Sequence, residues 1–143
     1  MLEEAFKQLE YLGADIVGIN CSRSPKTMLP LVRRVCQSVS CFIAMQPVAY
    51  RCTMERPYFQ ILEYEGHLAF PLELDLFVLT RFEMAEYALD AKAMGINYIG
   101  ACCGAAPHHI RAMAESLGRT VPNSKYSPKI ALHTIIGDEE HKR

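Results

Sequence analysis

Short apolar runs and amphipathic stretches alternate along this chain. Runs without a helical period are typical of buried strands, and they lie at residues 16–19, 41–45 and 97–101. Apolar residues spaced three or four positions apart predict four amphipathic helices, which begin near Leu2, Ser24, Thr80 and Pro107. Strands that alternate with such helices predict an α/β fold with a parallel sheet buried on both faces.

Turn and capping residues support these boundaries. Gly13 stands where a helix C-cap belongs, and Pro25 follows a serine in the way that opens a helix. Thr80 and Glu83 have the spacing of a capping box. The first predicted helix has no strand before it, and three strands are few for an α/β domain. We therefore expect these elements to be a piece of a larger barrel or sheet.

Two regions lie outside the alternation. Residues 47–79 form a connection with three prolines that is longer than an ordinary loop, and we interpret it as a candidate binding loop. Residues 119–143 contain Pro122 and Pro128 and end in charged side chains. We therefore predict an α/β unit at residues 1–118, followed by a C-terminal extension at residues 119–143.

The composition excludes several classes of function. Half of the 143 residues are apolar and 22% are charged, which favours a packed core over disorder. The net charge of −1 gives no electrostatic reason to expect a nucleic acid or an anionic membrane as a partner. The acidic N-terminus is no secretory signal, and the uncharged stretch 93–110 is interrupted by glycines and Pro107. We therefore expect a soluble, cytoplasmic protein.

The most distinctive chemical feature is the placement of the six cysteines. Without a secretory signal they indicate a reducing compartment, and no two of them form a CxxC pair. Cys21 follows the first predicted strand, whereas Cys102 and Cys103 follow the last one. The carboxyl ends of parallel strands are where ligands and catalytic groups gather. Three thiolates at that edge suit a zinc ion with one open coordination position.

Simpler roles compete with this zinc hypothesis. A buried cysteine often acts as a small apolar side chain, and this is the interpretation we favour for Cys36, Cys41 and Cys52. The same structural role is the alternative for the three cysteines at the strand ends. A vicinal disulfide between Cys102 and Cys103 is a third alternative.

His108 and His109 follow Pro107 at the start of the last predicted helix. A helix N-terminus carries a partial positive charge, which disfavours an added cation and favours a nearby thiolate over a thiol. We therefore expect helix-capping or surface roles for both histidines, and not metal ligation.

The segments around the strand-end cysteines resemble the zinc-dependent homocysteine S-methyltransferase family. The matching motifs are Gly18-Ile19-Asn20-Cys21 and Gly100-Ala101-Cys102-Cys103-Gly104, the second followed by Pro107-His108-His109-Ile110. Further similar segments, in the same order, are Gln46-Pro47-Val48-Ala49-Tyr50, Phe70-Pro71, Thr80-Arg81 and Leu132-His133-Thr134. The resemblance spans roughly residues 12–134 and is greatest to the betaine-dependent members.

This resemblance implies a fold, a metal and a reaction. The implied fold is the C-terminal portion, about strands six to eight, of a (β/α)8 TIM-type barrel, so that residues 1–118 are a partial homocysteine-binding barrel. The implied ligands of Zn²⁺ are Cys21, Cys102 and Cys103, with Asn20 and Tyr50 as candidate substrate-binding residues. The implied reaction transfers a methyl group from betaine or S-methylmethionine to the thiol of homocysteine, giving methionine. Full-length members also imply a homo-oligomer.

A second functional hypothesis stays open at this point. The family holds homocysteine and the methyl donor with residues from the first half of the barrel, and nothing in this chain corresponds to them. The chain is then a non-catalytic fragment or a degenerate paralogue that acts as a zinc-binding or interaction module. Methyltransferase activity of a purified preparation, measured together with its bound zinc, separates the two hypotheses.

Overall fold

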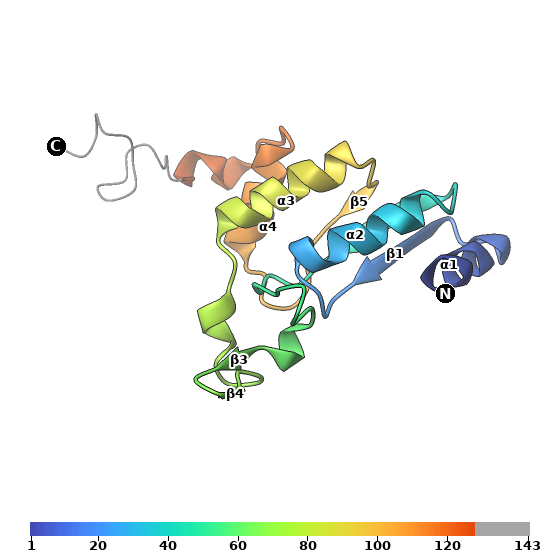
Figure 1. Cartoon of the computed structure of the whole chain (residues 1–143). Helices are drawn as coiled ribbons and strands as arrows, with labels where there is room; N and C mark the ends of the chain where they lie inside the picture. Colours follow the sequence, from blue (N-terminus) through green and yellow to red (C-terminus); the bar gives the residue numbers. More distant parts are fainter. Residues whose placement is uncertain (128–143) are drawn as a thin grey trace.

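The structure, a computed structural model, describes residues 1–127, which form a mixed α/β unit (Figure 1). Helices and the strands of a three-stranded parallel sheet alternate along this part of the chain, as the hydrophobic pattern predicts. The helices are α1 (Leu2–Tyr11), α2 (Pro25–Cys36), α3 (Arg81–Ala93) and α4 (Pro107–Ser116). The strands of the sheet are β1 (Ile16–Asn20), β2 (Phe42–Gln46) and β5 (Tyr98–Ile99).

The remaining described elements are short and lie outside this alternation. Within residues 47–79 they are the hairpin strands β3 (Glu63–Tyr64) and β4 (His67–Leu68) and the 3-10 turns η1 (Phe59–Ile61) and η2 (Leu74–Phe77). A third turn, η3 (Pro122–Tyr126), follows α4. The segment Leu132-His133-Thr134 and most of the predicted extension lie outside the described residues. None of the helices in residues 1–127 has the length and apolar character needed to cross a membrane.

Helix boundaries follow the local signals that the sequence carries. The Oγ1 atom of Thr80 accepts a hydrogen bond from the Glu83 N–H at 3.2 Å, and the Glu83 carboxylate accepts one from the Thr80 N–H at 2.7 Å. This reciprocal pair is the predicted capping box at the start of α3. Gly13 has a φ of +93°, which an L side chain rarely adopts, and α1 ends just before it.

Strand β2 is the centre of the sheet, paired in parallel with β1 on one side and with β5 on the other. The register aligns Asn20 of β1 with Gln46 of β2, and Ile99 of β5 with Met45 of β2. Because all three strands run in the same direction, the residues that follow them meet at one edge of the sheet.

Strand β5 is shorter than the predicted run 97–101. Pro47 follows β2 directly and has no N–H to return a hydrogen bond to the segment after Ile99. Two isolated hydrogen bonds continue the contact between the central strand and the segment after Ile99. The Gly100 N–H donates to the Met45 carbonyl at 3.0 Å, and the Cys102 N–H donates to the Pro47 carbonyl at 2.8 Å.

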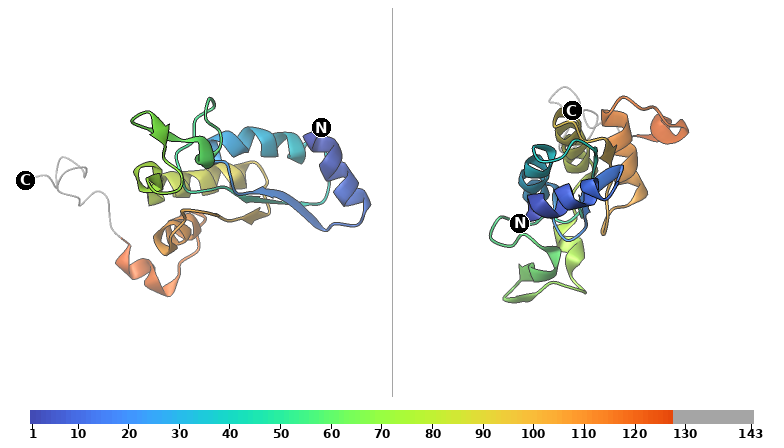
Figure 2. Two further views of the ribbon diagram at one scale, coloured as in Figure 1. Left: turned by 90° about the horizontal axis from the view of Figure 1, so that it is seen from below. Right: turned by 90° about the vertical axis from the view of Figure 1, so that its right-hand side faces the viewer.

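Only one face of the sheet is covered within the described residues. Val17, Ile43 and Met45 are buried against apolar side chains of the helices, and α2 and α3 lie on the same side of the strands (Figure 2). On the other face, Ile16 and Phe42 are more than half exposed, at 52% and 59%. The prediction of burial on both faces is therefore wrong for residues 1–127, while the exposed face agrees with the expected piece of a larger barrel or sheet.

The loop 47–79 stands beyond the carboxyl ends of the strands and is held together by its own small core (Figure 1). Its two ends lie side by side, because the Leu79 N–H donates to the Ala49 carbonyl at 2.9 Å and the Arg51 N–H donates to the Phe77 carbonyl at 2.7 Å. The buried residues of this second core are Val48, Cys52, Phe59, Leu62 and Ala69. The predicted binding loop is thus an ordered cover over one end of the sheet.

The register of β1 against β2 can be tested at Gly18. A Cβ atom there would lie 2.4 Å from the carbonyl oxygen of Ala44 and 2.7 Å from its Cβ atom. Backbone atoms cannot rotate away, so Gly18→Ala forces the two strands apart and is expected to cost about 1–3 kcal/mol of the free energy of unfolding. Urea denaturation followed by circular dichroism measures this loss.

The matched control is Gly100→Ala. A Cβ atom at Gly100 meets only the side chain of Gln46, at 3.0 Å or more, and that side chain can move. The control is expected to retain most of the wild-type stability. Equal stability of Gly18→Ala and Gly100→Ala would contradict the register.

Candidate metal centre

The end of the central strand fixes two of the three candidate cysteines. The Cys21 N–H donates to the Gln46 carbonyl at 2.9 Å, and the Cys102 N–H donates to the Pro47 carbonyl at 2.8 Å. Consecutive carbonyl groups at the end of β2 therefore anchor the residue that follows β1 and the segment that follows β5. This arrangement places two distant stretches of sequence next to each other by backbone pairing alone.

The third cysteine is held by the loop that follows β2. The carbonyl group of Cys103 accepts a hydrogen bond from the Ala49 N–H at 2.9 Å. Gly104 then turns the chain away with a φ of +77°. A Cβ atom at Gly104 would lie 2.6 Å from Cζ of Tyr50, so the position requires glycine both for its backbone angle and for its contact with the aromatic ring.

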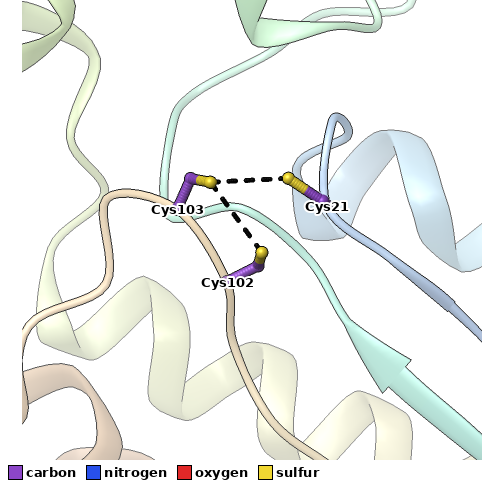
Figure 3. A group of neighbouring side chains, drawn as sticks. All are labelled: Cys21, Cys102 and Cys103. Atoms are coloured by element: carbon purple, nitrogen blue, oxygen red, sulfur yellow. Dashed lines mark hydrogen bonds between the residues drawn. The ribbon is translucent and has the colours of Figure 1, made fainter.

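The three sulfur atoms converge on one place (Figure 3). The Sγ atoms of Cys21 and Cys103 are 3.5 Å apart, and those of Cys102 and Cys103 are 3.8 Å apart. All three atoms lie within 4.8 Å of one another. The convergence predicted from the strand ends is therefore present, with 82 residues separating Cys21 from Cys103 in the sequence.

The turn after β1 has an unusual backbone. Cys21 and Ser22 have φ values of +63° and +61°, in the left-handed region that non-glycine residues seldom occupy. The Ser22 carbonyl accepts a hydrogen bond from the Phe59 N–H at 2.9 Å, so the loop over the sheet supports this turn. Nothing in the sequence around Cys21 predicts the left-handed conformation, because glycine or asparagine would be the usual signal.

The thiols perturb one another's pKa values. The pKa of Cys103 is raised to about 11. The largest cause is its hydrogen bond with Cys21, and burial and the neighbouring Cys102 are further causes. Burial raises the pKa of Cys21, but hydrogen bonds from Cys102, from the Ser22 N–H and from Cys103 outweigh burial and lower the pKa below its usual value. The cluster therefore favours a thiolate on Cys21 with the Cys103 thiol as a donor to it.

The geometry and donor set fit a zinc ion. Tetrahedral ligands with Zn–S bonds of about 2.3 Å have their sulfur atoms about 3.8 Å apart, close to the two distances within the cluster. Among the described residues, no fourth histidine, cysteine, aspartate or glutamate joins the group. Cys103 is exposed and the other two cysteines are partly buried, so one side of the cluster faces solvent. Three protein ligands with one open side could hold a metal ion in this arrangement.

Two further predicted residues border the cluster without joining it. Asn20 is the last residue of β1 and is exposed. The ring of Tyr50 packs against Phe59, with ring centroids 5.4 Å apart, and covers Gly104. Burial is the largest cause that raises the pKa of Tyr50, followed by the charge of Cys103.

The residues predicted to be structural do not join the cluster. Cys52 is buried in the second core, while Cys36 and Cys41 are partly buried against the main core. His108 is exposed, as expected of a surface residue. His109 is only 1% exposed, and its Nδ1 atom accepts a hydrogen bond from the Ala106 N–H at 2.9 Å, which is the expected capping role at a buried position.

The chain belongs to the homocysteine S-methyltransferase family, whose sequence pattern it matches over residues 1–117. It is 39% identical over 119 residues to betaine–homocysteine S-methyltransferase 1 of Danio rerio, a match that covers 80% of this chain and 29% of that protein. It is 33% identical over 122 residues to S-methylmethionine–homocysteine S-methyltransferase of Pongo abelii, which covers 80% of this chain and 32% of that protein. The chain thus spans less than a third of the length of these relatives.

The proximity of Cys21 and Cys103 can be tested with a trivalent arsenical, which binds tightly where two thiols reach one arsenic atom. Cys102→Ala removes the neighbouring thiol and leaves two sulfur atoms that are 3.5 Å apart in the structure. This variant is expected to take up one equivalent of phenylarsine oxide, measured by intact-protein mass spectrometry under native conditions. The control is Cys21→Ala combined with Cys102→Ala, and equal uptake by the two proteins would contradict the geometry.

Proposed function

We propose that this chain supplies the zinc-binding strand ends of a homocysteine S-methyltransferase. The observation that carries the proposal is the convergence of three sulfur atoms, from the end of β1 and the segment after β5, in a member of that family. The cysteines assigned to Zn²⁺ are Cys21, Cys102 and Cys103. Soft thiolate groups are ligands that suit zinc, whereas Mg²⁺ and Ca²⁺ bind oxygen ligands.

We infer that β1, β2 and β5 are about the sixth to eighth strands of a (β/α)8 barrel. Three features support this inference. Within residues 1–127 the strands of this sheet are all parallel, a helix follows each of them, and helices cover one face of the sheet while the other is exposed. In such a barrel the uncovered face looks inward, and the active site lies at the carboxyl ends of the strands. Residues 1–118 are then the barrel portion, and residues 119–143 are an extension.

The chain's own residues hold and border the metal. The backbone of β2 fixes Cys21 and Cys102 relative to each other, so the site is organised before an ion enters. Cys103 is on the solvent side, where the thiol of homocysteine can approach. Asn20 and Tyr50 lie beside the cluster, and we assign them to contacts with the substrate. A reducing compartment such as the cytoplasm keeps these thiols free of disulfides.

The proposed reaction forms one bond and breaks one. A zinc ion at the cluster, when bound, supplies a Lewis acid that keeps thiols deprotonated near neutral pH. The sulfur of homocysteine forms a bond to the methyl carbon of an onium donor. The C–N bond of betaine or the C–S bond of S-methylmethionine breaks, and its electron pair leaves with dimethylglycine or methionine. The thiol proton passes to solvent, and methionine is the methylated product.

A second candidate function is a zinc-binding or interaction module without catalysis. It is favoured by one observation, which is the exposed apolar face of the sheet at Ile16, Phe42 and Tyr98. Monomeric proteins rarely expose large apolar patches, and such surfaces mark sites of contact with other protein segments. The two candidates share the metal centre and differ in whether methyl transfer accompanies it.

Zinc binding is expected to require each of the three strand-end cysteines. The chain should bind one zinc ion, and Cys21→Ala, Cys102→Ala and Cys103→Ala should each lower the affinity by about tenfold or more, because two thiolates hold the ion less well than three. Competition with a chromophoric chelator, under reducing conditions, measures the affinity.

The controls for zinc binding are Cys36→Ala, Cys41→Ala and Cys52→Ala. Their side chains pack in the main core or in the second core, so each variant should still bind one zinc ion. Loss of zinc in one of these three variants, with tight binding retained in Cys102→Ala, would place the ion elsewhere in the chain.

Methyl transfer is expected to need the parts of the barrel that the longer relatives contain. The chain alone should yield no detectable methionine from homocysteine with betaine or S-methylmethionine, because positioning both reactants contributes many kcal/mol to such a reaction. A chimaera in which this chain replaces the matching third of the Danio rerio enzyme should produce methionine. Mass spectrometry with a labelled donor measures the product.

The matched control is the same chimaera with Cys103→Ala, which should lose turnover. Robust turnover by the 143-residue chain itself would refute the barrel-portion inference. A folded, zinc-loaded chimaera without turnover would favour the interaction module over the enzyme.

A further inference from the structure

His109 is a buried histidine that the proposed reaction does not use. It lies in the first turn of α4 and is only 1% exposed. Both ring nitrogens have backbone partners: Nδ1 is 2.9 Å from the Ala106 nitrogen, and Nε2 is 2.7 Å from the Leu79 carbonyl oxygen. The Ala106 N–H can only donate, so Nδ1 must be the unprotonated acceptor. The proton is therefore on Nε2, which donates to Leu79.

These two bonds close a ring of contacts that begins and ends at the paired cysteines. The Leu79 N–H donates to the Ala49 carbonyl, and the Ala49 N–H donates to the Cys103 carbonyl, each at 2.9 Å. Ala106, whose N–H donates to His109, is three residues after Cys103 in the same turn. The ring thus runs from Cys103 through both ends of the long loop to α4 and back to the turn.

Every other group in this ring is a main-chain amide. The imidazole of His109 is the one side chain in it, and it links the Leu79 carbonyl to the Ala106 N–H. The turn that carries Cys103 also contains Gly104 in the left-handed region, so its backbone depends on outside contacts to select one conformation. His109 supplies one such contact directly, at Ala106, and a second indirectly, because Leu79 pairs with Ala49, whose N–H donates to the Cys103 carbonyl.

We propose that His109 is a positioning residue for Cys103, which acts by fixing the turn that carries this thiolate. The inference rests on the proposed metal centre and assigns His109 no contact with metal or substrate. Without the imidazole, the Ala106 N–H and the Leu79 carbonyl lose these partners, and fewer contacts keep the turn that holds Cys103 against Cys21. The metal is then bound mainly by two thiolates. Outer groups that orient metal ligands commonly change affinity by 10–100-fold.

The test uses Cd²⁺, because its thiolate bonds absorb in the ultraviolet in proportion to the number of thiolates bound. The wild-type chain should show the absorbance of three thiolates per ion. His109→Ala should lower the Cd²⁺ affinity by about tenfold or more, and should lower the absorbance per bound ion by about one third as the contribution of Cys103 is lost. His109→Gln can still donate an N–H toward Leu79. Its Cd²⁺ affinity and its absorbance per ion should lie between those of the wild type and of His109→Ala.

Two control variants separate positioning from general destabilisation. His108→Ala removes the exposed neighbouring histidine and should leave both quantities unchanged. Met113→Ala removes a buried side chain from the same helix, outside the ring, and should lower the melting temperature without lowering the absorbance per ion. An equal loss of absorbance in Met113→Ala and His109→Ala would show that His109 is merely structural.

The remaining outcomes distinguish this inference from the metal centre itself. Three thiolates per ion in both the wild type and His109→Ala, with equal affinity, would overturn the positioning role and leave the metal centre in place. A wild-type chain without the absorbance of three thiolates would overturn the metal centre and the positioning role together.

Discussion

Parallel pairing of β2 with a strand on each side is the constraint on which the rest of the structure depends. Because the strands share one direction, the residues that follow β1 and β5 lie at the same edge of the sheet. There the carbonyl groups of Gln46 and Pro47 accept hydrogen bonds from the N–H groups of Cys21 and Cys102, respectively. A slip of one residue in either pairing would turn the side chains of that strand to the opposite face. The site therefore depends on register more than on any single contact between side chains.

The cluster lies where two apolar cores meet. The main core packs α2 and α3 against one face of the sheet, and the second core lies within the loop 47–79. Side chains of Cys21, Tyr50 and Cys102 pack against this second core, so the loop contributes to the site through burial as well as through backbone bonds. Such support keeps ligand side chains in place before an ion binds, which lowers the entropic cost of binding.

Much of this arrangement follows from the sequence, because it rests on local signals. The apolar runs, the capping box at Thr80 and the glycine after α1 predict the order of the four helices and of the three strands of the sheet. The positions of Cys21 and Cys102 directly after apolar runs, together with the parallel direction, predict that their thiols meet. The family resemblance then names the metal and the reaction that such a cluster would serve.

Other features depend on contacts that no local pattern reveals. The left-handed turn at Cys21 and Ser22 is supported by a hydrogen bond from Phe59 in the loop, and the buried His109 has its partner in Leu79, which is 30 residues away. The last of the predicted amphipathic helices also illustrates the limit. Met113 is buried but Ile110, three residues before it on the same helix, is 47% exposed. Periodicity shows which side chains are apolar and leaves open what covers them.

The most direct test of the account is X-ray absorption at the zinc K-edge on the zinc-loaded chain. Three cysteine ligands predict three sulfur scatterers at about 2.3 Å, with one lighter atom completing the coordination in the absence of substrate. A spectrum fitted by two or fewer sulfur atoms, or by nitrogen and oxygen ligands alone, would contradict the assignment of Cys21, Cys102 and Cys103 as a single metal centre.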